Sequence, residues 1–135
     1  MGAISSPIIA NGILYVGSAD KSLYAFDARS GNKLWSFATG NAIYSSPAVA
    51  NGIVYVGSAD HSVYALDARS GSQLWSFPTG GAIVSSPVVA NGIIYVGSAD
   101  DHLYAYALPS PDQPKPPSRP NPASLHPNLT LPLQR

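Results

Sequence analysis

Apolar residues occur along this chain in short runs that turn residues separate at regular intervals. The first stretch contains four such runs, at 6–10, 13–17, 23–27 and 33–37. Asn11-Gly12 joins the first two runs, and this pair favours a two-residue β-hairpin because both residues accept positive φ. No segment shows the 3.6-residue apolar period of a helix. The pattern predicts four short antiparallel strands and an all-β protein.

The strands of this stretch differ in how much of each is apolar. The first two runs are nearly continuous, as is typical of strands that are covered on both faces. The last run alternates, with Leu34 and Ser36 on one face and Trp35 and Phe37 on the other, as in a half-exposed outer strand. The two kinds of strand are those expected at the centre and at the rim of a β-propeller blade.

The whole stretch recurs every 40 residues. Ser5-Ser6-Pro7 returns at 45–47 and at 85–87, and residues 5–40 and 45–80 differ at nine of 36 positions, so 27 are identical. Such copies are one structural unit multiplied, and each needs its neighbours to cover its apolar faces. The repeats predict β-propeller blades at 5–40, 45–80 and 85–108.

The third repeat departs from the first two after Leu108. Pro109-Ser110-Pro111 follows where the other copies continue into a turn and an alternating strand. The third blade is therefore predicted to lack its outer strand, and residues 1–108 are predicted to form a partial propeller. Proline removes amide donors and restricts φ, so the Pro-rich residues 109–135 are expected to be a disordered tail.

One motif occurs in both complete repeats. It consists of an aspartate, a glycine four residues later and a tryptophan a further four residues on: Asp27, Gly31 and Trp35, then Asp67, Gly71 and Trp75. These residues resemble the tryptophan-docking motif of the pyrroloquinoline-quinone (PQQ) repeat family of β-propellers, and the resemblance covers residues 5–108. It implies that the indole packs between blades while the aspartate and glycine hold the turn that receives it.

Charge and composition exclude several classes of partner. The chain has seven basic and seven acidic residues, so no strong electrostatic field favours nucleic acid. It has no cysteine and no run of about 18 apolar residues, so we expect neither disulfides nor membrane insertion. These features do not determine the cellular compartment. It would be extracytoplasmic, periplasmic or secreted, if the chain is part of a longer exported protein.

The residues that could carry chemistry have simpler interpretations. Asp20, Asp60 and Asp100 occupy equivalent turns, where an aspartate bonds its own backbone. The three histidines lie at unrelated repeat positions, whereas a zinc site needs three or four converging ligands: His61, His102 and His126. Serines are abundant, but no base is positioned to activate one. We therefore expect no catalytic and no metal-binding residues.

The resemblance raises the question of a quinone-dependent dehydrogenase. Enzymes of that group resemble this chain in their repeats but add a calcium-binding set of acidic and asparagine side chains, a tryptophan floor under the cofactor and often a cysteine pair. None of these can be placed here, so no cofactor and no enzymatic activity are expected. The leading interpretation is a scaffold or protein-interaction module. The alternative is a fragment of such a dehydrogenase, or of another propeller enzyme, with its catalytic residues elsewhere.

Differences between the copies indicate which surface is free to vary. The turn between the second and third strands and the loop between blades share one face of a propeller. We predict that this face carries any interaction site, and we assign to it six residues: Lys21, Asn41, Tyr44, His61, Asp101 and His102.

Three blades are too few to close a ring, because propellers have about 4–8 blades. The uncovered faces of the first and third blades differ, so contact between two copies would be head-to-tail. A closed dimer with six blades is the predicted assembly of this chain by itself. A third interpretation is that the chain is a self-assembling building block whose similar copies reflect recent duplication.

Overall fold

The computed structural model describes residues 5–108 and 129–132. These residues form three four-stranded antiparallel sheets, which we call blades 1, 2 and 3. Blade 1 contains β1 (Ile8–Ala10), β2 (Ile13–Gly17), β3 (Ser22–Asp27) and β4 (Lys33–Ala38). Blade 2 contains β5 (Ala48–Ala50), β6 (Ile53–Gly57), β7 (Ser62–Asp67) and β8 (Gln73–Pro78). Blade 3 contains β9 (Val88–Ala90), β10 (Ile93–Ser98), β11 (His102–Ala107) and β12 (Leu129–Pro132).

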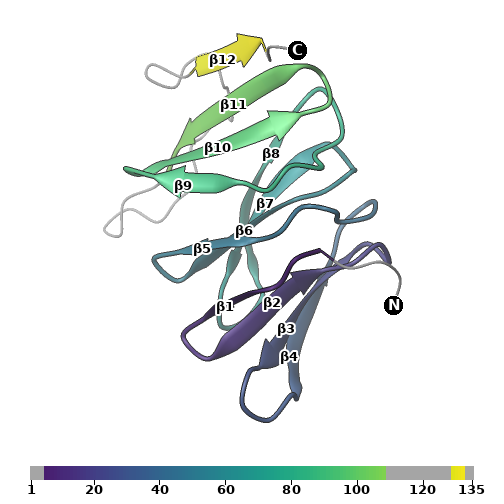
Figure 1. Ribbon diagram of the computed structural model, residues 1–135, viewed down its shortest axis with the longest axis vertical. Helices are drawn as coiled ribbons and strands as arrows, with labels where there is room; N and C mark the ends of the chain where they lie inside the picture. The colour runs from purple at the N-terminus through teal and green to yellow at the C-terminus, as the bar shows by residue number, and fades with distance from the viewer. Residues whose placement is uncertain (1–4, 109–128, 133–135) are drawn as a thin grey trace.

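The blades follow one another along the long axis of the molecule in the order of the sequence (Figure 1). Within each blade, consecutive strands are hydrogen-bonded neighbours, so each sheet is a simple meander. The part of the chain that the structure describes contains no helix. The all-β partial propeller that the sequence predicts is confirmed.

The hairpins form where the Asn-Gly pairs predict them. Asn11 and Gly12 have φ values of 53° and 79°, as a tight hairpin with two left-handed residues requires. The pairs at 51–52 and 91–92 repeat this geometry. Each pair fixes the register of its hairpin, so Ala10 faces Ile13 and Ala50 faces Ile53.

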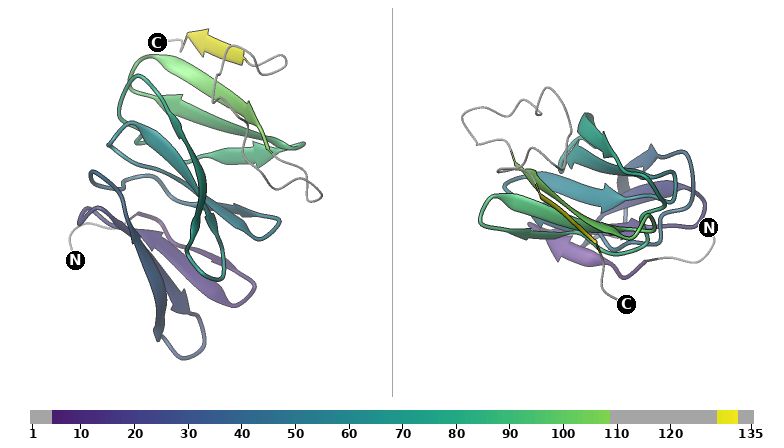
Figure 2. Two further views of the ribbon diagram at one scale, coloured as in Figure 1. Left: turned by 180° about the vertical axis from the view of Figure 1, so that it is seen from behind. Right: turned by 90° about the horizontal axis from the view of Figure 1, so that it is seen from above.

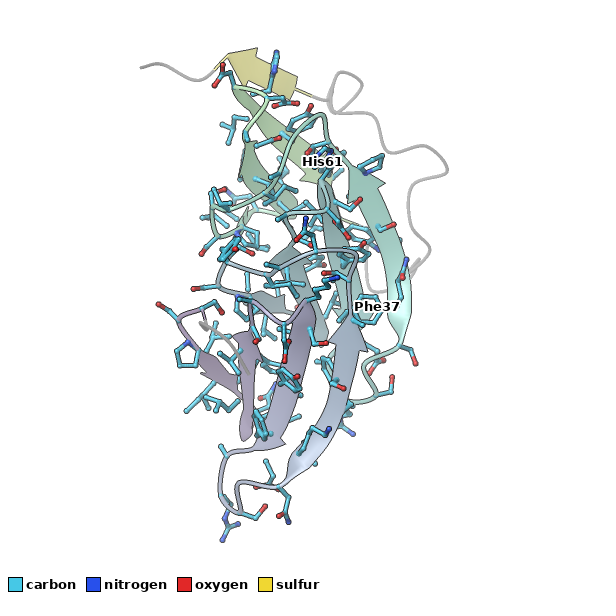
Figure 3. All side chains as sticks on the ribbon, turned by 90° about the vertical axis from the view of Figure 1, so that its right-hand side faces the viewer. Phe37 and His61 are labelled. Carbon is cyan, nitrogen blue, oxygen red and sulfur yellow. The ribbon has the colours of Figure 1, made fainter. Side chains whose placement is uncertain are left out.

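The core lies between the blades, because strand alternation gives each sheet two apolar faces. The forward face of a blade carries the residues equivalent to Tyr15, Leu23 and Trp35, and the rear face carries those equivalent to Val54 and Leu66. The forward face of blade 1 packs on the rear face of blade 2 in one buried cluster, and blade 2 packs on blade 3 in a second. Figures 2 and 3 show the stacked sheets and the side chains between them.

Blade 3 differs from the sequence prediction in one respect. The third repeat itself contributes three strands, as predicted, but Leu129–Pro132 pair with β11 as a fourth. The expectation of a disordered tail is therefore wrong for residues 129–132, while residues 109–128 and 133–135 lie outside the described residues. The physical reason is that β11 has a free edge, and an unpaired edge favours an added strand.

Candidate functional site

Trp35 joins blade 1 to blade 2. Its indole Nε1 donates a hydrogen bond to the backbone oxygen of Ala68, 3.2 Å away, and the Tyr15 hydroxyl donates to the same oxygen at 2.9 Å. The ring lies against Gly71, where a Cβ would come within 2.5 Å of the indole. A glycine is therefore needed at this position for close approach as well as for its φ of 78°.

The turn that receives Trp35 is held by Asp67. Its Oδ1 accepts hydrogen bonds from the amides of Arg69 and Ser70, and the Gly71 amide donates to its backbone oxygen. The amides of Ser70 and Arg69 hold the pKa of this carboxyl below its usual value, because they stabilise its charged form. Asp27, with Gly31 in the same conformation, builds the equivalent turn of blade 1. Trp35 thus lies against the turn that Asp67 and Gly71 form, while the described residues place no indole at the turn of Asp27 and Gly31.

Trp75 occupies the equivalent position between blades 2 and 3, but without the hydrogen bond. Its side chain is buried beside Tyr55 and Phe77, and its Nε1 is the single buried side-chain polar atom without a partner among the residues described. The residue equivalent to Ala68 is Leu108, but the third repeat has Ala107 in place of the turn aspartate and Pro111 in place of the turn glycine. Phe77 stacks on Tyr106 in this interface, with ring centroids 3.8 Å apart.

The repeated aspartates link neighbouring blades. Asp60 Oδ1 accepts from the Ser62 amide in its own turn, while Oδ2 accepts from the Tyr64 hydroxyl and from the Gly40 amide of the preceding blade. Asp100 repeats this with the Gly80 amide. The sequence interpretation of a turn aspartate accounts for Oδ1, but it missed the bond between blades. The spacing of 20 residues between Gly40 and Asp60, repeated at Gly80 and Asp100, was the available signal.

Hydrogen bonding also lowers the pKa of two of the repeated aspartates, Asp20 and Asp100. The bond from the Tyr24 hydroxyl is the main reason why the pKa of Asp20 is lowered. Burial opposes ionisation of Asp100, but the bonds from Tyr104, Gly80 and His102 outweigh it and lower its pKa. The carboxylates of Asp20 and Asp100 therefore act as charged acceptors within the blades.

The turn between the second and third strands and the loop between blades lie together. The Thr39 amide donates to the Lys21 oxygen, and its hydroxyl lies 2.9 Å from the Ser58 hydroxyl in the next blade. The Ile43 amide then donates to the Ser18 oxygen. We call the surface that these turns and loops form the loop rim. Five of the six residues that the sequence assigns to an interaction face belong to these turns and loops, and His102 is the first residue of β11.

Three of the six residues adopt an unusual backbone conformation. Lys21, His61 and Asp101 have φ values of 84°, 85° and 70°, in the left-handed region that favours glycine. All three residues are exposed, and Figure 3 shows His61 in the turn before β7. Positive φ in a non-glycine residue costs about 1–2 kcal/mol. The blades therefore keep a varied side chain at a position where glycine would be more stable.

The other three residues differ in their surroundings. Asn41 is exposed, and its side-chain oxygen accepts a hydrogen bond from the Ala42 amide. Tyr44 is 53% exposed. His102 lies beside Asp100, with its Nδ1 3.0 Å from the backbone oxygen of Asp100. Val84, which is equivalent to Tyr44, is 57% exposed and was not among the predicted residues. Two apolar side chains thus stand on the loop rim among polar ones.

The other candidate residues of the sequence have structural roles or lie elsewhere. The Ser45 hydroxyl is buried and bonds both the amide and the oxygen of Gly57. Within residues 5–108 and 129–132, no three His, Cys, Asp or Glu side chains lie close enough to hold a metal ion. His126 lies outside the described residues. In the same part of the chain there is no long apolar helix of the kind that crosses a bilayer.

Comparison with known families gives one match that covers most of the chain. The family model described as outer membrane protein assembly factor BamB, of the PQQ type, matches residues 2–46 and 19–109. A search of curated proteins gave no match.

Solved structures with the same arrangement of blades include enzymes, an assembly factor and a designed protein. The quinohemoprotein alcohol dehydrogenase ADHIIG from Pseudomonas putida HK5 is 28% identical over 76% of this chain, with a TM-score of 0.70. BamB from Moraxella catarrhalis is 21% identical over 78%, with a TM-score of 0.69, and the computationally designed Ika4 protein is 21% identical over 79%, with a TM-score of 0.72. This chain spans 18% of the dehydrogenase, 34% of BamB and 67% of Ika4.

Proposed function

This chain belongs to the PQQ-type β-propeller family whose model is described as outer membrane protein assembly factor BamB, and we propose that it is a non-enzymatic scaffold for protein contacts. The observation that carries the proposal is the loop rim. It combines exposed apolar side chains, Tyr44 and Val84, with varied polar ones in a strained conformation. Strain that is kept at an exposed position indicates a functional constraint.

The residues of this chain do not fit pyrroloquinoline quinone. Both tryptophans are buried between blades, so neither is free to form the floor of a cofactor site. Asp60 and Asp100 are engaged by hydrogen bonds from two blades, and the chain has no cysteine. We therefore derive no redox step, and these contacts support a structural role for the blades.

The scaffold proposal is tested by changing the loop rim alone. The double variant Tyr44→Ser, Val84→Ser should leave the melting temperature within a few degrees, because exposed side chains contribute little to stability. It should weaken capture of a protein partner in crosslinking from cells of the source organism. The matched control is Leu34→Ser with Leu74→Ser on the outer strands, where both leucines are exposed away from the rim. Equal capture by both variants would contradict the proposal.

Self-association is the second part of the proposal, because each end of the described stack has an uncovered apolar face. On the forward face of blade 3, Tyr95 and Leu103 are partly exposed, whereas their equivalents in blades 1 and 2 are at most 1% exposed. On the rear face of blade 1, Leu14 and Phe26 are partly exposed, whereas Val54 and Leu66 are fully buried.

The two uncovered faces are equivalent to faces that already pack on each other within the chain. The forward face of blade 1 already packs on the rear face of blade 2. Tyrosine, leucine and alanine recur at the equivalent positions of the forward face of blade 3, without the tryptophan, and the rear face of blade 1 is apolar like that of blade 2. The partner that fits is a further blade of the same kind, which a second copy of this chain provides. Two copies joined head-to-tail at both ends would form six blades, within the usual range of about 4–8.

Light scattering tests this assembly. The purified chain is expected to be a dimer at micromolar concentration, and Leu103→Asp is expected to make it a monomer because it places a charge in the joint. Leu34→Asp is the matched control, since this leucine is 47% exposed on β4. A well-folded monomer of the unchanged chain would overturn the proposed dimer and leave the rim proposal standing.

A second candidate function is a segment of a quinone-dependent dehydrogenase. The observation in its favour is the 28% identity to the Pseudomonas putida quinohemoprotein alcohol dehydrogenase. Alcohol or sugar oxidation with PQQ and calcium supplied distinguishes the two candidates. We expect no turnover above background, and turnover that disappears when Asp20, Asp60 and Asp100 are replaced together would favour the enzyme.

A further inference from the structure

The outer edge of β11 holds β12 in the register of a genuine outer strand. Leu129 lies opposite Ala105 and Leu131 opposite Leu103. In blade 2, Trp75 lies opposite Ala65 and Phe77 opposite Val63. The positions therefore correspond residue by residue, although β12 belongs to no repeat.

The residue types correspond as well. Leu129-Thr130-Leu131-Pro132 takes the register positions of Trp75-Ser76-Phe77-Pro78. Both segments have a large apolar residue, a hydroxyl residue, a second large apolar residue and a proline. The edge of β11 thus accepts an extended segment of this pattern.

Blade 3 lacks the features that fasten an outer strand in the other blades. In blade 2 only residues 68–72 separate β7 from β8, and the Asp67 turn holds them. In blade 3, residues 108–128 separate β11 from β12, and leucine stands at the position of the docking tryptophan. The Trp75 N–H, which would bond that turn, has no acceptor in the described chain. β12 is therefore held by edge pairing and by its tether, not by a turn.

We propose that the β11 edge is a strand-binding site for extended segments of the pattern apolar, hydroxyl, apolar, proline. β12 is its occupant within the chain, and the β12 segment of a second copy can replace it. Strand addition to a sheet edge combines backbone hydrogen bonds with selection at alternate residues. A tether raises the local concentration of β12 only to roughly millimolar values, so an added segment can compete with β12 for the β11 edge. This site is separate from the loop rim, and it is the edge of the sheet whose forward face would form the proposed dimer.

The test uses the full chain and a fluorescent peptide with the sequence of residues 127–135. Leu131→Asp in the chain weakens the internal occupant and leaves β11 intact, so the peptide should bind this variant at least ten-fold more tightly than the unchanged chain. Leu125→Asp, outside β12, is the control variant and should bind like the unchanged chain. A peptide carrying the same Leu131→Asp change should not bind. Equal binding to all three chains, or binding of the changed peptide, would overturn the proposal.

Hydrogen exchange shows where the peptide binds. In the Leu131→Asp chain, the β11 amides that point toward β12 should exchange at least ten-fold faster than in the unchanged chain, while those that point toward β10 and those of β7 keep their rates. Added peptide should restore the rates of the β12-facing amides. The β7 rates report whether the blades stay folded. If they also rise, Leu131→Ala replaces the aspartate variant. Unchanged rates of the β12-facing amides in a variant with intact β7 would show that β12 does not occupy the edge, and would refute the proposal.

Discussion

The two interfaces between blades, which we call joints, have the same architecture, but their docking tryptophans make different contacts. Between blades 1 and 2, Trp35 donates to Ala68 and covers Gly71, and both Ala68 and the ring are buried. Between blades 2 and 3, Trp75 is equally buried but its N–H has no acceptor in the described chain. The comparison separates the two contributions of a docking tryptophan, which are apolar burial in both joints and a hydrogen bond in only one.

The two joints also differ in aromatic packing, because the first contains an edge-on pair of Phe37 and Tyr64, with ring centroids 5.3 Å apart, whereas the second contains stacked rings. Trp75 and Phe77 are 4.3 Å apart between ring centroids, and Phe77 stacks on Tyr106. Blade 2 has Leu66 at the position of Tyr106, so this stack has no equivalent in the first joint. Aromatic pairs add about 0.5–1.5 kcal/mol beyond their buried area, which is comparable to the net value of one hydrogen bond.

Removing either indole should have the largest effect. Trp35→Ala and Trp75→Ala are each expected to destabilise the protein by about 3–5 kcal/mol, because each empties a buried aromatic site. The loss should be larger for Trp35, which also gives up its bond to Ala68. Urea unfolding measures both values. An unchanged midpoint and slope for either variant would show that its indole does not join the blades.

Alanine substitution of the two docking glycines should distinguish the turn at Gly71, which receives an indole, from the turn at Gly31, which receives none in the described chain. Gly31→Ala places its Cβ in open space, so its only cost in stability is that of a positive φ, about 1–2 kcal/mol. Gly71→Ala meets the Trp35 ring as well, and overpacking adds about 1–3 kcal/mol. Thermal unfolding of the two variants gives the difference. Equal losses would mean that the indole moves aside without cost.

Replacing each indole by phenylalanine should isolate the hydrogen bond. Trp35→Phe loses the bond to Ala68, whereas Trp75→Phe removes a buried donor that has no partner in the described chain. Trp35→Phe should therefore be the more destabilising change, by about 1–2 kcal/mol, because an unsatisfied donor contributes nothing favourable. Both variants are compared in the same urea titration. A larger loss at Trp75 would indicate that its N–H finds an acceptor outside the described residues.

The smallest expected effect is on acid stability. The pKa of Asp67 is lowered in the folded protein, so its contribution is complete above the ordinary value of 3.8 and is lost as the pH falls below that value. Asp67→Asn should reduce the free energy of unfolding near pH 7 and flatten its fall between pH 5 and pH 3. Urea titrations over this range compare it with the unchanged chain. An equally steep fall in the variant would assign the acid sensitivity to other carboxyls.

The local sequence pattern was sufficient to predict most of the fold and the docking turns. Asn-Gly pairs accept two consecutive left-handed residues, so Asn11 and Gly12 predict their hairpin without any distant contact. Asp67 and Gly71 likewise predict their turn, since the bonds that hold it lie within a few residues. The 40-residue period then predicts that each blade is covered by its neighbours.

Tertiary structure alone decided the contacts between distant segments. The bond from Gly40 to Asp60 joins two blades, and the Asp60 carboxylate looks like an ordinary turn residue in the sequence. The pairing of β12 with β11 is the strongest case. Leu129-Thr130-Leu131-Pro132 carries the pattern of an outer strand, but a four-residue pattern becomes a strand only where a sheet edge lacks a partner. The sequence by itself determined the blades, and the free edge left by the third repeat determined what completes the last one.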